Sequence, residues 1–321
     1  MNGVTKNKPF IVAIVGPTAS GKTELGVALA KAINGEVISG DSMQVYQGMD
    51  IGTAKVSTAE MDGIPHHLID ILKPDQTYSA YDFKQQTQNL ITDITARGKV
   101  PIIVGGTGLY IQSVIFDYQF DDETISPETE KRVAQQMEEL KSYSNEALHD
   151  YLGTFDPDSQ REIHPNNRKR VERAITYYLS TKKVLSNRKK STQLTENYDT
   201  LLIGIKMSRE TLYSRINNRV DIMLSHGLLD EVQELIELGY ESCQSMQAIG
   251  YKEMIPVIKN EMPLDEAVTL LKQHSRNYAK RQMTWFKNKL NVHWLDREKM
   301  SLTSMLSELI PLINKRRNEH D

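Results

Sequence analysis

The residues best suited to chemistry form a glycine-rich loop near the N-terminus. The segment GPTASGKT matches the phosphate-loop pattern G-x-x-x-x-G-K-[ST]. Its glycines let successive backbone N–H groups turn toward phosphate oxygens, and the helix expected to begin here adds the positive end of its dipole. Lys22 supplies a mobile cation, and Thr23 supplies a hydroxyl ligand for Mg²⁺. The predicted phosphate-binding residues are Gly16, Pro17, Thr18, Ala19, Ser20, Gly21, Lys22 and Thr23.

Two more polar residues follow apolar segments that are expected to be strands. Asp41 comes just after Glu36–Ser39, and Thr107 follows Val100–Val104 within a Gly-Gly-Thr-Gly segment. Ligands of open α/β sheets bind at the carboxyl ends of the strands, so Asp41 lies beside the phosphate loop if the first two strands are neighbours. There its carboxylate can accept a proton from an incoming nucleophile, and the Thr107 hydroxyl can donate to a leaving-group oxygen. The alternative is that both side chains only cap the turns in which they lie.

The loop alone leaves the reaction open. Most such loops hold ATP or GTP in enzymes that also carry a strand ending in Asp, which orders the metal. Here the segment Val100–Val104 ends in Gly-Gly-Thr, which indicates chemistry other than ordinary phosphoryl transfer. One alternative is a P-loop small-molecule kinase in which Asp41 activates a hydroxyl. Another, from a different class, is a non-catalytic RNA-binding module.

The elements around these residues predict an α/β fold. Apolar runs at Phe10–Val15 and Val100–Val104 are typical of strands buried on both faces, and Glu36–Ser39 and Leu201–Lys206 also have strand character. Lys22–Ile33 has the apolar spacing of a helix. We expect a P-loop NTPase-like parallel sheet flanked by helices, built from residues 1–120 and 198–321. Residues 121–197 contain helical patterns and no convincing strand, so we expect an all-helical insertion domain there. The segment Asn314–Asp321 is predicted to be a frayed tail.

Composition and charge limit the class of protein. Apolar residues make up 39% and charged residues 25% of the 321 residues, no apolar run of membrane-spanning length is present, and Cys243 is the single cysteine. These features exclude an internal disulfide and a cysteine-rich zinc site, and they predict a cytoplasmic protein that does not enter a membrane. The net charge of −3 excludes a generally basic nucleic-acid binder, but residues 161–190 and 272–289 form two locally basic stretches. Trp285-Phe286 lies in the second, where helical spacing favours core packing over base stacking.

Several longer motifs resemble those of one known family. They are Gly-Pro-Thr-Ala-Ser-Gly-Lys-Thr (16–23), Asp-Ser-Met-Gln-Val-Tyr-Gln-Gly-Met-Asp-Ile-Gly-Thr-Ala-Lys (41–55), Pro-His-His-Leu (65–68), Val-Gly-Gly-Thr-Gly-Leu-Tyr (104–110), Ile-His-Pro-Asn-Asn (163–167), Arg-Val-Glu-Arg-Ala (170–174), Ala-Ile-Gly-Tyr-Lys (248–252) and Ala-Lys-Arg-Gln-Met-Thr-Trp-Phe (279–286). In their order and in their coverage of nearly the whole chain, they resemble the bacterial tRNA dimethylallyltransferases, also called tRNA isopentenyltransferases.

The resemblance implies a reaction and roles for the residues. The family transfers a dimethylallyl group from dimethylallyl diphosphate to the exocyclic amine of the adenine 3′ of the anticodon in tRNA. By resemblance, the phosphate loop holds diphosphate, Asp41 is the general base, and Thr107 bonds an oxygen of the leaving group. Arg215 is expected to reach the diphosphate, with Arg219 as the alternative. Mg²⁺, bound through Thr23, is the expected cofactor.

The resemblance also implies the contacts with tRNA. The anticodon stem-loop is the expected partner, and the protein is expected to act as a monomer. One group of contacts surrounds the extruded adenine, and two more lie in the insertion domain and near residue 250. The residues implied are Asp41, Ser42, Met43 and Gln44; Lys169, Arg170, Val171, Glu172 and Arg173; and Gln247, Ala248, Ile249, Gly250, Tyr251 and Lys252.

Overall fold

The computed structural model describes residues 8–116, 118, 126–187 and 196–318, and the chain divides into two compact units. One unit combines Met1–Asp117 with Glu196–Asp321, and the other is Tyr118–Thr195. The predicted division at residues 121 and 197 falls close to this one, although residues 119–125 and 188–195 lie outside the described ranges. Each unit has its own hydrophobic core, so each is described by itself.

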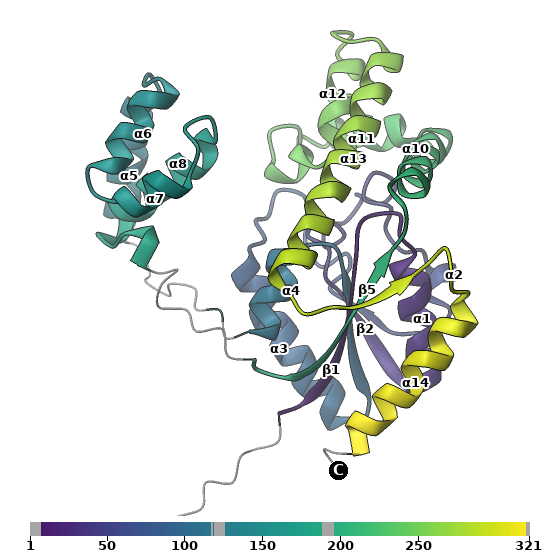
Figure 1. The fold of residues 1–321 in the computed structure, drawn as a ribbon. Helices are drawn as coiled ribbons and strands as arrows, with labels where there is room; N and C mark the ends of the chain where they lie inside the picture. The colour runs from purple at the N-terminus through teal and green to yellow at the C-terminus, as the bar shows by residue number, and fades with distance from the viewer. Residues whose placement is uncertain (1–7, 117, 119–125, 188–195, 319–321) are drawn as a thin grey trace, which may run out of the picture. The chain divides into compact units, whose positions relative to one another are not determined.

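A six-stranded sheet forms the centre of the first unit (Figure 1). The strand order is β3-β2-β4-β1-β5-β6, and every pair is parallel. This confirms the predicted P-loop-like α/β class. The strands are β1 (Phe10–Val15), β2 (Gly35–Ser39), β3 (His66–His67), β4 (Val100–Gly105), β5 (Asp199–Lys206) and β6 (His293–Asp296).

Helices cover both faces of the sheet and extend beyond its carboxyl-end edge (Figure 1). The helices of this unit are α1 (Lys22–Ile33), α2 (Thr58–Met61), α3 (Ala80–Ala96), α4 (Gly108–Ile115), α10 (Arg209–Ser225), α11 (Leu228–Glu237), the 3₁₀ turn η1 (Gln244–Gln247), α12 (Tyr251–Ile258), α13 (Leu264–Lys289) and α14 (Leu302–Asn318). Within the described residues, none of the helices has the length and apolar character needed to cross a bilayer.

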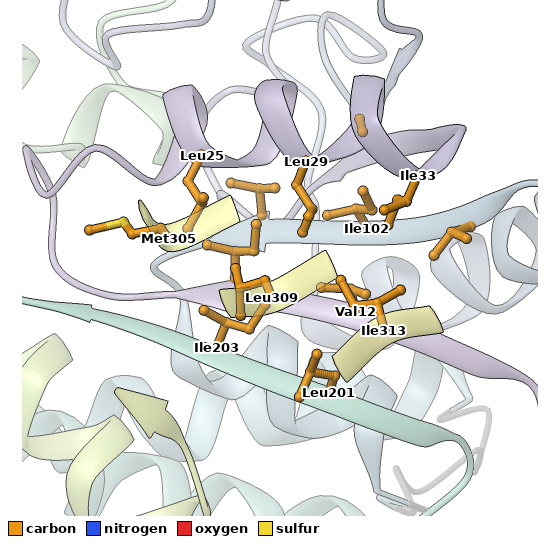
Figure 2. Packing of buried hydrophobic residues seen from close by; sticks show 14 of the residues in the cluster. Val12, Leu25, Leu29, Ile33, Ile102, Leu201, Ile203, Met305, Leu309 and Ile313 are labelled. Carbon is orange, nitrogen blue, oxygen red and sulfur yellow. The ribbon is translucent and has the colours of Figure 1, made fainter. Parts of the chain in front are cut away.

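The alternation of side chains along each strand builds a core on each face. In β1, Val12 and Ile14 face α1 and α14, whereas Ile11 and Ala13 face α3 and α4. Figure 2 shows the first of these layers, where apolar side chains of α1, such as Leu29, and of α14, such as Leu309, meet β1, β4 and β5. The predicted frayed tail is wrong for its first part, because α14 continues to Asn318, and Arg316 in it pairs with Asp199 of β5.

The second unit contains only helices within its described residues, as predicted. They are α5 (Pro127–Leu140), α6 (Asn145–Gly153), α7 (Pro157–Glu162) and α8 (Arg168–Thr181). Local sequence explains two of their starts: Ser126 and Asp156 each accept a hydrogen bond from a backbone N–H of the first turn, and each is followed by a proline at the first helical position. Leu148, Leu152 and Ile175 are buried between the helices.

A buried carboxylate joins the sheet to the segment after α3. Glu36 lies in β2 with a side chain that is 1% exposed, and it pairs with Arg97, Lys99 and His67. Hydrogen bonds from Arg97, followed by those from Lys99 and His67, outweigh burial and hold the pKa of Glu36 well below its usual range. The hydrogen bonds to these partners therefore outweigh the energetic cost of removing the carboxylate from water.

We predict that Glu36→Gln destabilises the fold by about 1–3 kcal/mol at neutral pH, because it removes charge-assisted hydrogen bonds to a buried acceptor. Since folding lowers the pKa of Glu36, its stabilisation is complete above the unfolded pKa of about 4.5 and is lost as the pH falls below it. The variant should therefore show a flatter decline of unfolding free energy in acid, measured by urea denaturation. The control Asp93→Asn, which touches the same Arg97 at the surface, should change stability little. An unchanged acid dependence in Glu36→Gln would contradict this assignment.

Candidate active site

The phosphate loop lies between β1 and α1, as predicted. Gly16 and Gly21 have φ angles of 150° and 91°, and Ala19 has a φ of 62°, so the chain repeatedly enters conformations that favour glycine. Position 16 favours glycine for a second reason, because a Cβ there would lie 3.0 Å from the Ile205 carbonyl oxygen. Gly21 then caps α1, whose first residue is Lys22. The loop thus places the positive end of a helix at the edge of the sheet where strands end.

Two cations lie close together above this loop. Lys22 Nζ donates to the Pro17 carbonyl at 2.7 Å, and both Lys22 and Arg219 line one pocket. Burial first, and then the Arg219 charge, lower the pKa of Lys22 to about 7, while Asp41 acts in the opposite direction. Burial also lowers the pKa of Arg219. Two partly dehydrated cations facing one carboxylate leave an excess of positive charge, which favours a bound anion.

Asp41 reaches this pocket from the loop after β2. The first two strands are not neighbours, because β4 lies between them. The loops after β2 and β4 nevertheless touch: Gly40 N donates to Val104 O at 2.8 Å, and a Cβ on Gly105 would lie 2.3 Å from Gly40 O. Asp41 Oδ1 accepts from Met43 N at 2.8 Å. The turn-capping alternative is therefore correct for one oxygen, yet the carboxylate also faces the cation cluster.

Thr107 is the first residue of the turn into α4, but its side chain does not cap that helix. Its Oγ1 is buried and makes no hydrogen bond of standard geometry in the described part of the protein. The Tyr278 hydroxyl lies near Thr107, Gln282 and Asp41, and burial with the Asp41 charge raises the pKa of Tyr278 to about 12. The capping alternative is therefore wrong for Thr107, whose buried hydroxyl instead lies beside the Tyr278 hydroxyl.

Lys22, Asp41, Arg219 and Tyr278 share one cavity of about 460 Å³, whereas Thr107 is not among the residues that line it. The predicted residues that line it come from the phosphate loop, the loop after β2 and the segment near residue 250. They are Thr18, Lys22, Thr23, Asp41, Ser42, Met43, Gln44, Gln247, Ala248, Ile249 and Lys252. Gly105 and Gly106, next to Thr107, also contribute. An apolar wall from α10 completes the lining, with Ile216, Val220 and Met223 on one helical face.

The two arginines of α10 differ in whether they line the cavity. Arg219 lines the cavity and donates to the Ala54 carbonyl at 3.3 Å. Arg215, one helical turn earlier, is exposed and does not contribute to the lining. The expectation that Arg215 reaches the diphosphate is therefore replaced by its alternative, Arg219.

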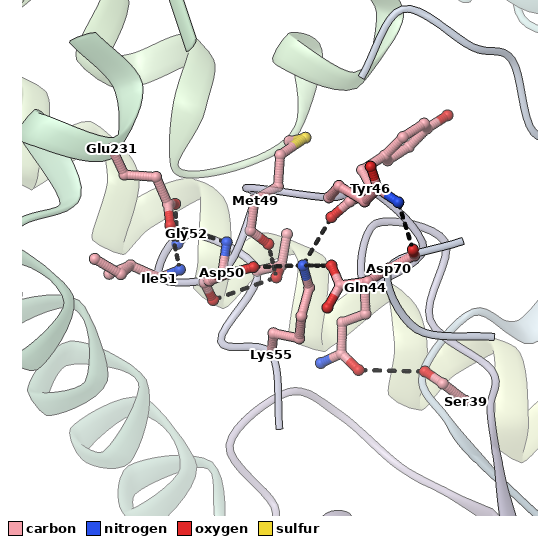
Figure 3. A network of polar contacts seen from close by, with 12 residues as sticks. Ser39, Gln44, Tyr46, Met49, Asp50, Ile51, Gly52, Lys55, Asp70 and Glu231 are labelled. Atoms are coloured by element: carbon pink, nitrogen blue, oxygen red, sulfur yellow. Dashed lines mark hydrogen bonds and ion pairs between the residues drawn. The ribbon is translucent and has the colours of Figure 1, made fainter. Parts of the chain in front are cut away.

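The loop that carries Met43 and Gln44 is tied to the helical region by one carboxylate (Figure 3). Glu231 accepts hydrogen bonds from the backbone N–H groups of Asp50, Ile51 and Gly52 at 2.9, 2.7 and 3.0 Å. It also accepts from the Tyr251 hydroxyl at 2.6 Å. Gly52 is required here, because a Cβ would lie 2.4 Å from the Tyr251 ring.

The same loop is held on its other side by Lys55, whose side chain is 6% exposed. Its ammonium group donates to the Tyr46 carbonyl at 2.7 Å and pairs with Asp50 and Asp70 (Figure 3). Glu231 and Lys55 together satisfy the backbone of a loop that has little regular structure of its own. The loop can therefore present its side chains to the cavity in a fixed arrangement.

Some of the residues predicted to contact tRNA lie on the surface and others do not. Lys169, Arg170 and Arg173 lie on one exposed face of α8. Val171 is fully buried in the core of the second unit, and Tyr251 is fully buried against Gly52. The side chains of these two residues cannot contact tRNA, so for them the prediction is wrong. Of the others, Glu172 pairs with Arg168 on the same helix, and Gly250 has a φ of 106°.

Sequence reasoning missed the contribution of α13 to the cavity. Ser275, Tyr278, Arg281 and Gln282 line it from this helix. The first, second and fourth recur three or four residues apart, which is the spacing of one helical face. That periodicity was the available signal, but polar residues on a basic helix are typical of a solvated face as well. Trp285 and Phe286 pack into the core, which confirms the packing interpretation.

Comparisons with a family profile and with known protein sequences all match the chain to one family. The profile of the IPP transferase family matches residues 44–289. A tRNA dimethylallyltransferase from Staphylococcus haemolyticus (strain JCSC1435) is 68% identical over 315 residues, which cover 98% of this chain and 95% of the relative. Another from Staphylococcus aureus (strain JH9) is 70% identical over 306 residues, with 95% and 98% coverage.

Solved structures of two transferases that act on tRNA are also similar to this chain. The tRNA delta(2)-isopentenylpyrophosphate transferase of Staphylococcus epidermidis is 66% identical, with a TM-score of 0.72 over 96% of this chain and 100% of that one. A eukaryotic dimethylallyltransferase acting on tRNA is 30% identical, with a TM-score of 0.82 over 98% of this chain and 80% of that one.

The two arginines of α10 provide a matched test of the anion site. Arg219→Met should weaken binding of inorganic diphosphate about tenfold to hundredfold, because it removes a charged contact in a partly dehydrated pocket. Arg215→Met, with the same loss of charge one turn away, should change the affinity by less than about twofold. Isothermal titration with diphosphate and Mg²⁺ measures both. Weaker binding in Arg215→Met with normal binding in Arg219→Met would refute the assignment.

Proposed function

Because the chain belongs to the tRNA dimethylallyltransferase family, we propose that it transfers a dimethylallyl group from dimethylallyl diphosphate to the exocyclic amine of an adenine in tRNA. One observation carries this proposal: a single cavity combines a phosphate loop with its cations, a carboxylate and an apolar wall. The cations match a diphosphate, the wall matches a branched five-carbon group, and the carboxylate can receive the amine proton. The relatives offer no support for the small-molecule kinase or the non-catalytic RNA-binding module.

The diphosphate would be held by the loop and by two side chains. The N-terminal turn of α1, Lys22 and Arg219 surround the part of the cavity in which negative charge grows as the carbon–oxygen bond breaks. Groups that are already oriented there stabilise the departing anion without reorganising. The Thr107 hydroxyl does not cap α4 and lies beside the Tyr278 hydroxyl, and in this proposal it would donate to a leaving-group oxygen.

Asp41 would act on the other reactant. The amine nitrogen forms a bond to C1 of the dimethylallyl group while the bond from C1 to the diphosphate oxygen breaks. The amine proton passes to the Asp41 carboxylate, whose Oδ1 is oriented by Met43 N. An adenine amine is a weak nucleophile, so removing its proton as the new bond forms lowers the barrier. The base must leave its stack to enter the cavity, where Met43 and Gln44 lie beside Asp41.

Mg²⁺ fits the chemistry of this site. Thr23 is exposed at the cavity and offers a hard oxygen ligand next to the phosphate loop. Among the described residues, no group of three or more acidic, histidine or cysteine side chains is arranged so that it could hold a metal ion. A magnesium ion would therefore rest mainly on diphosphate oxygens, water and the Thr23 hydroxyl, and it would supply neutralisation of the leaving group.

The proposal extends to the partner. The adenine is the one 3′ of the anticodon, and the anticodon stem-loop is the part of tRNA that binds. The exposed Lys169, Arg170 and Arg173 of α8 match an RNA backbone, as do Gln247 and Lys252 at the cavity. The enzyme would work as a monomer in the cytoplasm.

Asp41→Asn tests the general base without disturbing the turn, because the amide oxygen can still accept from Met43 N. We expect kcat for tRNA prenylation to fall about 10²-fold to 10⁴-fold. The affinity for tRNA should stay within about threefold, since it does not depend on proton transfer. Diphosphate should bind at least as tightly as it does to wild type, because the variant removes the one negative charge that faces Lys22 and Arg219. Mass spectrometry of nucleosides from tRNA incubated with dimethylallyl diphosphate measures the product.

Asp62→Asn, which changes a surface acid paired with Lys31, is the control and should be fully active. A fully active Asp41→Asn enzyme would remove the general-base role. A wild-type protein that gives no prenylated adenosine would remove the proposed function itself.

A further inference from the structure

A buried amide side chain spans the two loops of the cavity that bear on the leaving group. Gln282 of α13 is 6% exposed. Its Oε1 accepts from Thr18 N of the phosphate loop at 2.9 Å, and its Nε2 donates to Gly106 O at 3.0 Å. Gly106 immediately precedes Thr107. Gln282 is therefore bonded to one loop after β1 and to another after β4.

The first of these bonds concerns the phosphate loop directly. Backbone N–H groups of such a loop usually turn toward the anion. Thr18 lines the cavity, but its N–H is committed to Gln282 instead. The side chain thus fixes the orientation of one peptide in the middle of the loop. The neighbouring N–H groups and Lys22 depend on that orientation for their own direction.

The second bond explains a sequence requirement in the β4 loop. A Cβ on Gly106 would lie 2.2 Å from Gln282 Nε2, and a Cβ on Gly108 would lie 2.2 Å from Trp285 Cδ1. Helix α13 therefore packs directly on the backbone either side of Thr107. Only glycine at these two positions allows that approach. Thr107 lies between two contacts with the same helix.

The amide group is chemically matched to both partners. One end must accept from an N–H and the other must donate to a carbonyl, which a glutamine does with no charge. A lysine could not accept, and an ionised glutamate could not donate. Burial makes the match important, because an unpaired polar group here would cost about 1–3 kcal/mol.

From this geometry we propose that Gln282 is a positioning residue for the transfer reaction, which sets the spacing between the phosphate loop and Thr107. This inference rests on the proposed function, because it assigns the two loops to the same leaving group. Gln282 would not touch the reactants in this role. It holds the donors on both sides of the diphosphate at the separation that the departing anion needs.

The first test uses Gln282→Met, which keeps the length of the side chain and removes both hydrogen bonds. We expect kcat to fall about tenfold to hundredfold and diphosphate affinity to fall about tenfold, with tRNA affinity unchanged within about twofold. Gln273→Met, an exposed change two turns earlier on α13, is the matched control and should match wild type. Thermal unfolding checks that the variant folds. Wild-type kcat in a folded Gln282→Met enzyme would overturn the inference.

The second test measures coupling. If Gln282 acts partly by placing Thr107, the double variant Gln282→Met/Thr107→Val should lose much less kcat than the product of the two single losses. Fully multiplicative losses would show that Gln282 does not act through Thr107. These comparisons require active wild-type enzyme, so failure of the proposed function would be visible separately as absence of product.

The third test uses Gln282→Glu. A protonated glutamic acid accepts with one oxygen and donates with the other, so it restores both bonds, whereas the ionised form opposes the Gly106 carbonyl. The rate of this variant relative to wild type should therefore rise as the pH is lowered from 8 to about 6. The rate of Gln282→Met relative to wild type should not change with pH. A constant deficit in both variants would indicate loss of packing alone and would contradict the positioning role.

Discussion

The site depends on a close backbone contact between the loop that follows β2 and the loop that follows β4. Gly40 and Gly105 approach each other so closely that a Cβ on Gly105 would overlap the Gly40 peptide, and Gly40 N bonds to Val104 O. Because β4 lies between β1 and β2, this contact brings Asp41 toward the phosphate loop across an intervening strand. The loop after β4 continues into Thr107, the residue before α4, at the same carboxyl-end edge of the sheet. A side chain at Gly105 would push the loop that carries Asp41 away from the loop after β4.

Charge in the cavity then determines what can bind there. Lys22 and Arg219 each have a lowered pKa, mainly because burial removes them from water. Their mutual repulsion is relieved only in part by the one carboxylate that they face. A multiply charged anion such as diphosphate would relieve the remaining repulsion. The free energy of binding would therefore come largely from charges that the fold has already brought together. The apolar wall of α10 adds the second requirement, a small branched hydrocarbon attached to that anion.

The sequence predicted those parts of the structure that have a local signal. Strands β1 and β4 are apolar almost throughout, and β2 and β5 contain shorter apolar segments, whereas β3 has two residues and β6 reads HWLD, so neither edge strand is evident in the sequence. The phosphate loop is defined by a short glycine pattern that is evident in the sequence itself. Arg215 and Arg219 are one helical turn apart, and only burial distinguishes them. The contact between Thr18 and Gln282 spans 264 positions, and no pattern in either segment indicates it.

The unpredicted contacts share a physical role. Glu231 accepts from three successive N–H groups of the Asp50–Gly52 turn, and Gln282 bonds to backbone groups of Thr18 and Gly106. Both side chains come from helices late in the chain and satisfy the backbone of catalytic loops from its first third. Loops without regular structure need such partners, because their buried N–H and C=O groups have no ladder to join. The helices α11 and α13 therefore do more than cover the sheet edge: they complete the hydrogen bonding of the loops, and the geometry of the reaction follows from how those helices pack.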